Sequence, residues 1–333
     1  MIAPYCKSRN SPSEVSMIGE SSGASDNFRA ALLMVCSMVL FAFEDMFIKL
    51  LSADLPFSQV LGLIGLIGWL AFWIMLRAQG GRLFTRDLLR PPVILRNISE
   101  AIGSIGIVVA LALSDLSSTA AIMQALPLGI VLGAALFLGE PVGWRRWGAI
   151  GAGFLGVLLV IRPGLAGFQP VSLMAVVAVL GLTARDVATR RIPAHVPSLQ
   201  LAASAFLAIL LASVAMGVVL GQAPAMLDAR QGLTLACCMA VGLGGYSLLV
   251  IATRLGQAAA LAPFRYARLV FALILALVVF GERPDAMTLI GAAIIVGSGC
   301  YAMLREARLR RNQLRAVGMR HAEPSFRNAK ARV

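Results

Sequence analysis

The apolar residues of this chain gather into ten long runs, separated by short polar segments that contain most of the charges. A helix needs about 20 predominantly apolar residues to cross the hydrocarbon core of a bilayer. Each run has about this length, so the pattern predicts ten membrane-spanning helices. The predicted spans are 30–51, 56–76, 94–113, 118–138, 147–162, 171–190, 199–221, 233–253, 258–280 and 287–304.

The composition agrees with this pattern. The 333 residues are 59% hydrophobic and 14% charged, with a mean hydropathy of +0.84. A soluble domain has about 45–50% apolar and about 25% charged residues. Since so few polar residues cannot cover a water-soluble fold, the composition argues against a soluble enzyme, a disordered scaffold and a secreted disulfide-bonded domain. The predicted fold class is an all-α polytopic membrane protein.

The net charge of +13 is interpreted as a topology signal and not as a sign of nucleic-acid binding. Lys and Arg concentrate on the cytoplasmic side of membrane proteins. With the N-terminus in the cytoplasm, most basic residues fall on that side, so both termini are expected there. We expect a disordered tail at 1–28 and a basic tail at 306–333. The excess of Arg over Lys, with abundant Ala and Gly, suggests a bacterial genome rich in G and C, and we expect the protein in the inner membrane of a bacterium.

An internal repeat relates the two halves of the chain. Three features recur after 141 to 143 residues: an acid in the first and sixth spans, a Gly-Glu turn after the fourth and ninth, and a glycine in the fifth and tenth. Because five spans per unit is an odd number, the second unit enters the membrane from the opposite face, as in transporters that alternate access. A gene duplication without mechanical meaning is the other interpretation. The matching pairs are Asp45 and Asp186, Glu140 and Glu282, and Gly148 and Gly291.

Several motifs carry a resemblance to a known family. They are the Asp45…Lys49 end of the first span, the two Gly-Glu turns, Pro263-Phe-Arg-Tyr266, and Gly297-Ser-Gly299-Cys-Tyr301. With these motifs the chain resembles the EamA-like branch of the drug/metabolite transporter superfamily. The resemblance implies two inverted five-helix repeats, at 29–162 and 171–305, a central cavity, and transport of small organic solutes.

The chain departs from that family at one position. Many relatives carry an Arg six residues after the Gln of the second helix, whereas Gln59 is followed at that spacing by Gly65. A solute contact made by that Arg in relatives therefore cannot be assumed here.

Ionisable side chains within the predicted spans are candidates for function, because each costs about 2.5–3.5 kcal/mol on insertion scales without a partner or a cavity. Asp45 and Lys49 are spaced to pair on one helix face, although Lys49 can also reach the interface. Asp45 and Asp186 are interpreted either as gates at two mouths of one cavity or as members of structural ion pairs. The candidates for gating or structural ion pairs are Glu44, Asp45, Lys49, Arg185 and Asp186.

A second group of residues is predicted to contact the solute. Arg265 and Arg268 flank Tyr266 in the ninth span, and guanidinium forks suit carboxylate or phosphate groups. A structural pairing with Glu100 is the alternative for these arginines, and Glu100 is also spaced to anchor Arg96. The predicted substrate-binding set is Arg265, Arg268, Tyr266, Glu100, Gln124 and Tyr246. These charges favour an amphoteric or anionic metabolite, such as an amino acid or a nucleoside-like cofactor.

The function expected from these features is a secondary transporter of a small metabolite, with a passive facilitator as the alternative. A membrane-embedded enzyme is disfavoured, because the spans contain no histidine and no G-x-S-x-G motif. We expect no catalytic residue, cofactor, metal or nucleic acid, and lipid as the surrounding partner. Gly129 and Gly133 form a G-x-x-x-G motif, which suggests a homodimer.

Overall fold

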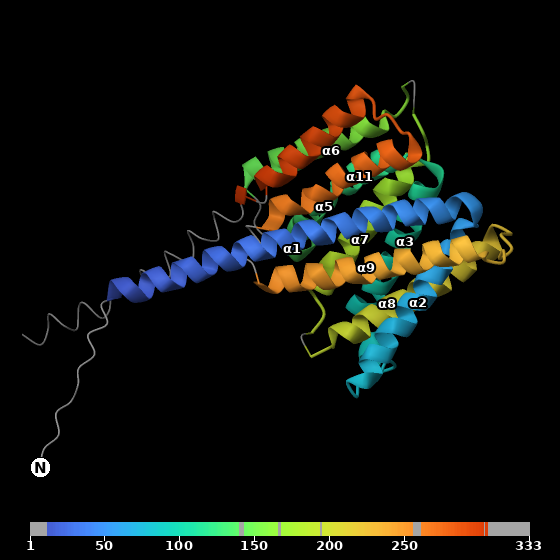
Figure 1. Cartoon of the computed structure of the whole chain (residues 1–333), viewed down its shortest axis with the longest axis horizontal. Helices are drawn as coiled ribbons and strands as arrows, with labels where there is room; N and C mark the ends of the chain where they lie inside the picture. The colour runs from blue at the N-terminus through green and yellow to red at the C-terminus, as the bar shows by residue number, and fades with distance from the viewer. Residues whose placement is uncertain are drawn as a thin grey trace, which may run out of the picture.

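A computed structural model describes residues 12–139, 143–165, 168–193, 195–255, 261–302 and 304–305, without the side chains of 12–27, 254 and 262 (Figure 1). The described residues form helices and connecting turns. Within the described residues, nine helices are long and apolar enough to cross a membrane, and a tenth apolar helix, Ala286–Ala302, is slightly shorter. The prediction of an all-helical protein with ten apolar spans is confirmed.

Five spans belong to each half of the chain. In the first half they are α1 (Pro12–Asp54), α2 (Phe57–Ala78), α3 (Pro91–Leu113), α4 (Leu116–Met123) with α5 (Leu126–Leu138), and α6 (Trp144–Ile161). In the second half they are α7 (Ser172–Thr189), α8 (Ser198–Val219), α9 (Ala229–Leu255), η2 (Ala262–Tyr266) with α11 (Ala267–Phe280), and Ala286–Ala302. A short 3₁₀ helix, η1 (Arg86–Leu89), precedes α3.

Helix α1 is longer than the first predicted span. It begins at Pro12, inside the segment for which the sequence predicts a disordered tail, and its apolar part is Phe28–Asp54. The predicted basic tail at 306–333 and the turn residue Glu140 lie outside the described residues.

Two spans are interrupted at corresponding places of the two halves. The fourth breaks between α4 and α5, where the backbone nitrogens of Gln124 and Ala125 each bond a carbonyl three residues back. The ninth breaks between η2 and α11. One proline follows the first break and a second lies within η2. Proline removes a backbone hydrogen-bond donor from a helix. Discontinuous helices at matching positions are typical of inverted-repeat transporters.

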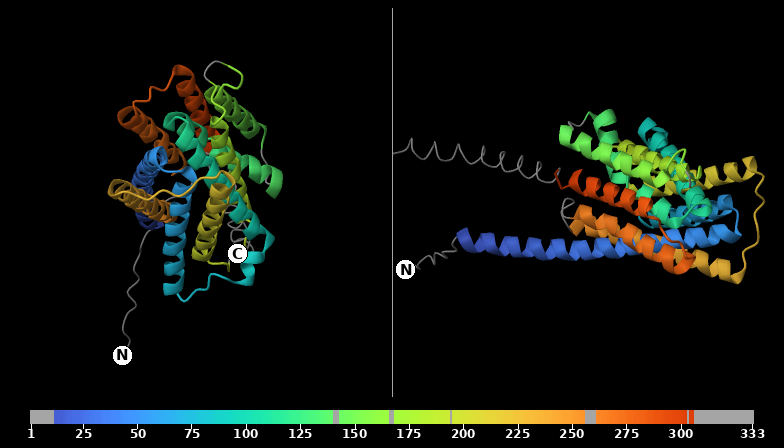
Figure 2. Two further views of the ribbon diagram at one scale, coloured as in Figure 1. Left: turned by 90° about the vertical axis from the view of Figure 1, so that its right-hand side faces the viewer. Right: turned by 90° about the horizontal axis from the view of Figure 1, so that it is seen from above.

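The helices pack in pairs drawn from both halves. Helix α3 packs along α7, α1 along α9, and α2 along α8. Figure 1 shows α1 and α9 side by side, and α6 beside the last helix at the edge of the bundle opposite α2 and α8. The same arrangement is visible from above in Figure 2. The two halves are therefore interleaved and do not form separate bodies.

Glycine permits the closest of these contacts. A Cβ atom on Gly181 of α7 would lie 2.6 Å from the backbone nitrogen of Gly103 of α3. The G-x-x-x-G motif of α5 also serves packing within the chain, because a Cβ on Gly129 or Gly133 would meet Thr183 or Val187 of α7. Since α7 of the same chain covers this face, the motif gives no support to the homodimer that it suggested.

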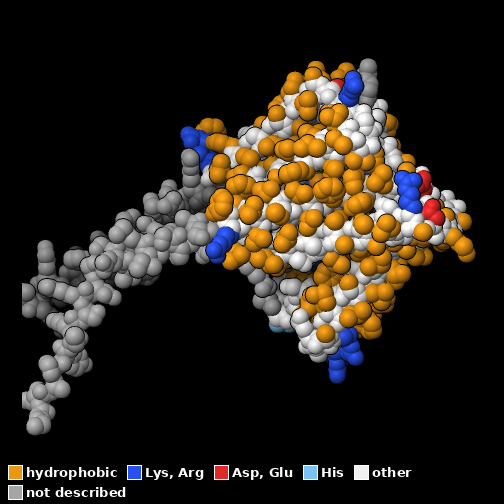
Figure 3. Space-filling view, viewed as in Figure 1, with side chains coloured by type: hydrophobic (Ala, Val, Ile, Leu, Met, Phe, Trp, Pro, Cys, Tyr) orange, Lys and Arg blue, Asp and Glu red, His pale blue; other side chains and the backbone are white. Residues whose placement is uncertain are grey.

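The outer surface of the bundle is apolar. Figure 3 shows hydrophobic side chains over the face of the helices, with the visible charged groups at the ends. Large side chains such as Val218 and Val278 are 77% and 75% exposed. In a bilayer these side chains contact lipid tails.

Candidate functional site

A cavity of about 200 Å³ lies between α1, α2 and α3 of the first half and α7, α8 and α9 of the second. Its polar lining groups are Glu44, Arg96, Glu100, Arg185 and Tyr246. The other lining residues are Phe41, Ile64, Phe72, Ala202, Ala205, Phe206, Ile209, Met239, Gly242 and Leu243. The first three spans of both repeats thus contribute side chains to a single chamber.

Aromatic rings form one wall of the cavity. The rings of Phe72 and Phe206 stack with centroids 5.4 Å apart, and Tyr246 meets Phe72 edge-on at 6.1 Å. Three helices, α2, α8 and α9, supply these rings. Such a wall offers flat apolar faces to a planar group.

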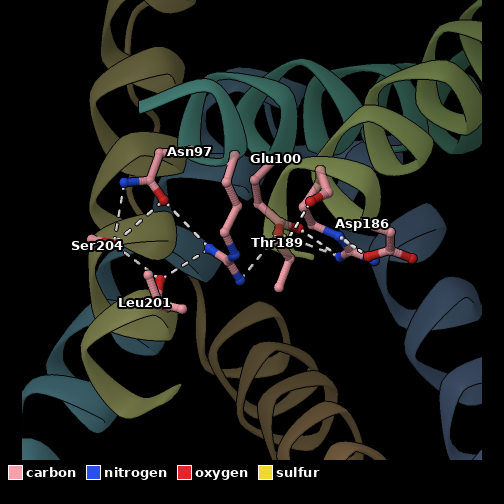
Figure 4. A network of polar contacts seen from close by, with 8 residues as sticks. Asn97, Glu100, Asp186, Thr189, Leu201 and Ser204 are labelled. Atoms are coloured by element: carbon pink, nitrogen blue, oxygen red, sulfur yellow. Dashed lines mark hydrogen bonds and ion pairs between the residues drawn. The ribbon is translucent and has the colours of Figure 1, made fainter. Parts of the chain in front are cut away.

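A network of ion pairs forms another wall. Arg185 on α7 donates to Glu100 on α3 at 3.1 and 3.3 Å, and to its own neighbour Asp186 at 2.8 Å. Arg96 reaches Glu100 at 3.9 Å and donates to the carbonyl of Leu201 at 3.0 Å. Figure 4 shows how the network continues through Asn97 to Ser204 of α8. The predicted anchoring of Arg96 by Glu100 is present, and Glu100 also holds Arg185.

The partner of Arg268 is Asp45 and not Glu100. Arg268 donates to both carboxylate oxygens of Asp45, at 2.6 and 2.9 Å, and its guanidinium lies 5.5 Å from the ring centroid of Phe41. The proposed pairing with Glu100 is wrong, because α1 packs against α11 and Asp45 faces that helix. Glu100 on α3 faces α7 instead.

The predicted pairing of Asp45 with Lys49 is also wrong. Lys49 lies 3.6 Å from Glu282 and donates to the carbonyls of Leu111 and Ser114 at the end of α3. Glu282 accepts hydrogen bonds from the backbone nitrogens of Leu116 and Ser117, at 2.8 and 3.0 Å, and so caps the first turn of α4. We call Lys49, Glu282 and the start of α4 the capping cluster.

Besides Arg268, three other predicted binding residues do not line the cavity. In the described part of the chain, Arg265 makes no ion pair or hydrogen bond, and it is half-buried. The hydroxyl of Tyr266 is buried without a partner against Gly299 of the last helix. Gln124 is buried beside the break in the fourth span. Like Arg268, these three side chains lie at the interrupted helices.

The residues that do line the cavity combine both predicted sets. Glu100 and Tyr246 come from the predicted binding set, and Glu44 and Arg185 come from the predicted ion-pair set. The phenylalanines and Arg96 were not predicted as binding residues. The departure from the family at Gly65 also receives an explanation: a Cβ there would lie 2.8 Å from the backbone nitrogen of Leu210, so the close packing of α2 on α8 leaves no room for a side chain.

Charged pairs outside the spans hold the ends of the bundle. Arg162 after α6 pairs with Asp285, and the Thr288 nitrogen donates to the same carboxylate. These donors lower the pKa of Asp285 to about 2. Beside η1, His195 and Arg90 donate to Asp87 and lower the pKa of its carboxyl. Burial raises the pKa of Asp115, which lies next to the capping cluster.

These features define an inverted-repeat membrane transporter: ten apolar spans, breaks at corresponding places, and one cavity lined by both halves. The model of the EamA-like transporter family matches the chain twice, over residues 28–162 and 169–304. The chain therefore belongs to the EamA-like transporter family, and the resemblance seen in its motifs is confirmed.

Several relatives with stated functions are similar over much of their length. The S-adenosylmethionine uptake transporter of Rickettsia felis is 27% identical, over 64% of this chain and 71% of that protein. The riboflavin transporter of Rhizobium johnstonii is 29% identical, over 65% and 71%. The pseudopaline exporter of Pseudomonas aeruginosa is 26% identical, over 82% and 95%. A crystal structure with 22% identity superposes with a TM-score of 0.55, over 83% of this chain and 98% of that one, and supports the fold.

Proposed function

We propose that this protein moves a small organic metabolite across the bacterial inner membrane by alternating access, with both termini in the cytoplasm. The observation that carries the proposal is the cavity, because the same three spans of each inverted repeat line it. A site shared by two inverted halves can be exposed to either side when one half moves against the other.

The packing of the bundle supports a conformation in which the outer end of the bundle is closed. In the proposed topology, the capping cluster and the apolar cluster of Leu51, Leu55, Val60 and Leu111 lie in the outer half. The cavity lies beyond this cluster, near residues such as Arg96 and Tyr246 that belong to the cytoplasmic half of their helices. In this topology, packed side chains close the outer half of the bundle, whereas the cavity lies towards the cytoplasmic half.

The relatives narrow the class of solute. Two of them are named for S-adenosylmethionine and riboflavin, which both carry a planar heterocycle. The aromatic wall formed by Phe72, Phe206 and Tyr246 suits such a ring. We therefore propose a metabolite with a planar ring as the solute.

The proposal is tested with the purified full-length protein in proteoliposomes. Uptake and counterflow of labelled S-adenosylmethionine and riboflavin are measured with and without an imposed proton gradient, against empty liposomes. Accumulation above equilibrium in the gradient indicates a secondary transporter, whereas counterflow without accumulation indicates a facilitator. If neither solute, nor any member of a wider panel of amino acids and nucleosides, enters faster than in empty liposomes, the proposed function is wrong.

A further inference from the structure

Among the described residues that line the cavity, Glu44 is the acid without an ion-pair partner. Its neighbour Asp45 is bound by Arg268, whereas the carboxylate of Glu44 faces the cavity and α9. A Cβ on Gly242 of α9 would lie 2.5 Å from the Oε1 atom of Glu44. Within the part of the chain that the structure describes, this carboxylate makes neither an ion pair nor a hydrogen bond. An acid inside a membrane span is costly without a compensating group.

The other charges of the cavity already neutralise one another. Glu100 is shared by Arg96 and Arg185, and Arg185 also binds Asp186. Two guanidinium groups thus face two carboxylates. An anionic solute would have to displace one of these carboxylates from its arginine. Arg265, which has no ion-pair or hydrogen-bond partner among the described residues, does not line the cavity.

Glu44 is therefore the carboxyl group of the cavity that no described basic side chain pairs with, and the cationic group of a solute can compensate its negative charge. Phe41, Phe72, Phe206 and Tyr246 line the same chamber, and aromatic faces attract both planar rings and cations. The chamber is complementary to a molecule that has a planar ring and a positive charge.

We infer that the cavity selects a metabolite with a net positive charge and a planar ring, and that the carboxylate of Glu44 binds the cationic group. This inference rests on the proposed function, because it assumes that the cavity is the solute site. It differs from the amphoteric or anionic metabolite that the acids and arginines of the spans favoured in the sequence.

The test compares two probes that differ by one methyl group and one positive charge. S-adenosylmethionine carries a sulfonium, and S-adenosylhomocysteine carries a neutral thioether on the same skeleton. Binding of each probe to the purified full-length protein in nanodiscs is measured by calorimetry. A charge-assisted contact in a buried site corresponds to an affinity ratio of about 10- to 150-fold, so the parental protein is expected to prefer S-adenosylmethionine by at least about tenfold.

Three variants locate the source of this preference. Glu44→Gln removes the charge at constant shape and should abolish the preference. Gly242→Ala places a methyl group against the carboxylate and should reduce it while the charge remains. Asp54→Asn is the matched control, because Asp54 is an exposed acid at the end of the same helix, and it should keep the full preference. Thermal unfolding of each variant is recorded on the same preparation.

The outcomes are distinct from those of the uptake experiment. Equal affinity of the parental protein for the two probes, or no binding of either, overturns the inference even if riboflavin or another solute is transported. If Glu44→Gln keeps the full preference but removes the pH dependence of uptake, Glu44 carries a proton and the inference is also overturned. Loss of preference in Glu44→Gln, with retention in Asp54→Asn, supports it.

Discussion

The ion pair between Asp45 and Arg268 gives the sharpest test of how the bundle is held together. Its two hydrogen bonds, at 2.6 and 2.9 Å, join α1 of the first repeat to α11 of the second. The side chains are 6% and 24% exposed. Removing one member of a buried pair leaves the other charge without a partner and costs about 3–5 kcal/mol. Because Arg268 keeps some exposure, we expect Asp45→Asn and Arg268→Gln each to lose about 3 kcal/mol.

The double variant separates a true pair from two independent effects. In Asp45→Asn with Arg268→Gln, neither of the two positions carries a charge, so most of the lost stability should return. The free energy of unfolding is measured by titration with SDS in mixed micelles, with helix content followed by circular dichroism. Arg90→Gln, which breaks an exposed pair outside the spans, serves as the control and should cause no measurable loss.

Two results would refute this reasoning. If the losses of the two single variants simply add in the double variant, the side chains do not interact in the folded protein. If Arg268→Gln unfolds like the parental protein but loses uptake, Arg268 contacts the solute and its assignment to a structural pair is wrong.

Three further predictions concern other parts of the chain. Because the pKa of Asp285 is lowered to about 2, its pairing with Arg162 should stabilise the protein above the unfolded pKa of about 3.9; this contribution should disappear as the pH falls towards 2, and the pH–stability curve of Asp285→Asn checks it. Gly181→Val should prevent α3 and α7 from packing, whereas Gly151→Ala, with open space around its Cβ, should not; thermal unfolding distinguishes them. In a variant without the five native cysteines, Arg230→Cys should react with a membrane-impermeant thiol reagent from outside; labelling only from the cytoplasm would contradict the proposed topology.

The apolar pattern predicts the spans well, because a bilayer demands long apolar helices whatever their neighbours. It does not predict which charges meet. Glu44 and Asp45 are adjacent in sequence, yet a helix turns by about 100° per residue, so one faces the cavity and the other faces α11. The partner of Asp45 depends on helix packing, which no spacing within one span reveals.

The aromatic wall was missed for a related reason. Phe72 is 7% exposed and Phe154 is 61% exposed, but both are phenylalanines in apolar helices. In a soluble protein, the polar face of each helix would mark the outward side. In a membrane protein both faces are apolar, so the sequence pattern does not distinguish a ring in the cavity from a ring in lipid. Glu100 and Tyr246 were predicted because polar groups are rare enough in spans to stand out.

The capping cluster has a consequence for the resting populations of the carrier. When the end that contains Glu282 opens, its carboxylate releases the amides of α4 and the ammonium of Lys49. Water replaces part of these contacts, so the net penalty is on the order of 1–3 kcal/mol, and this term alone favours the state in which the capping cluster is closed by a factor of about 5 to 150. Apparent affinity falls in proportion to the competent fraction. In the proposed topology, a solute outside should therefore bind the empty carrier more weakly than the same solute inside, so that the two directions of transport should saturate at different concentrations.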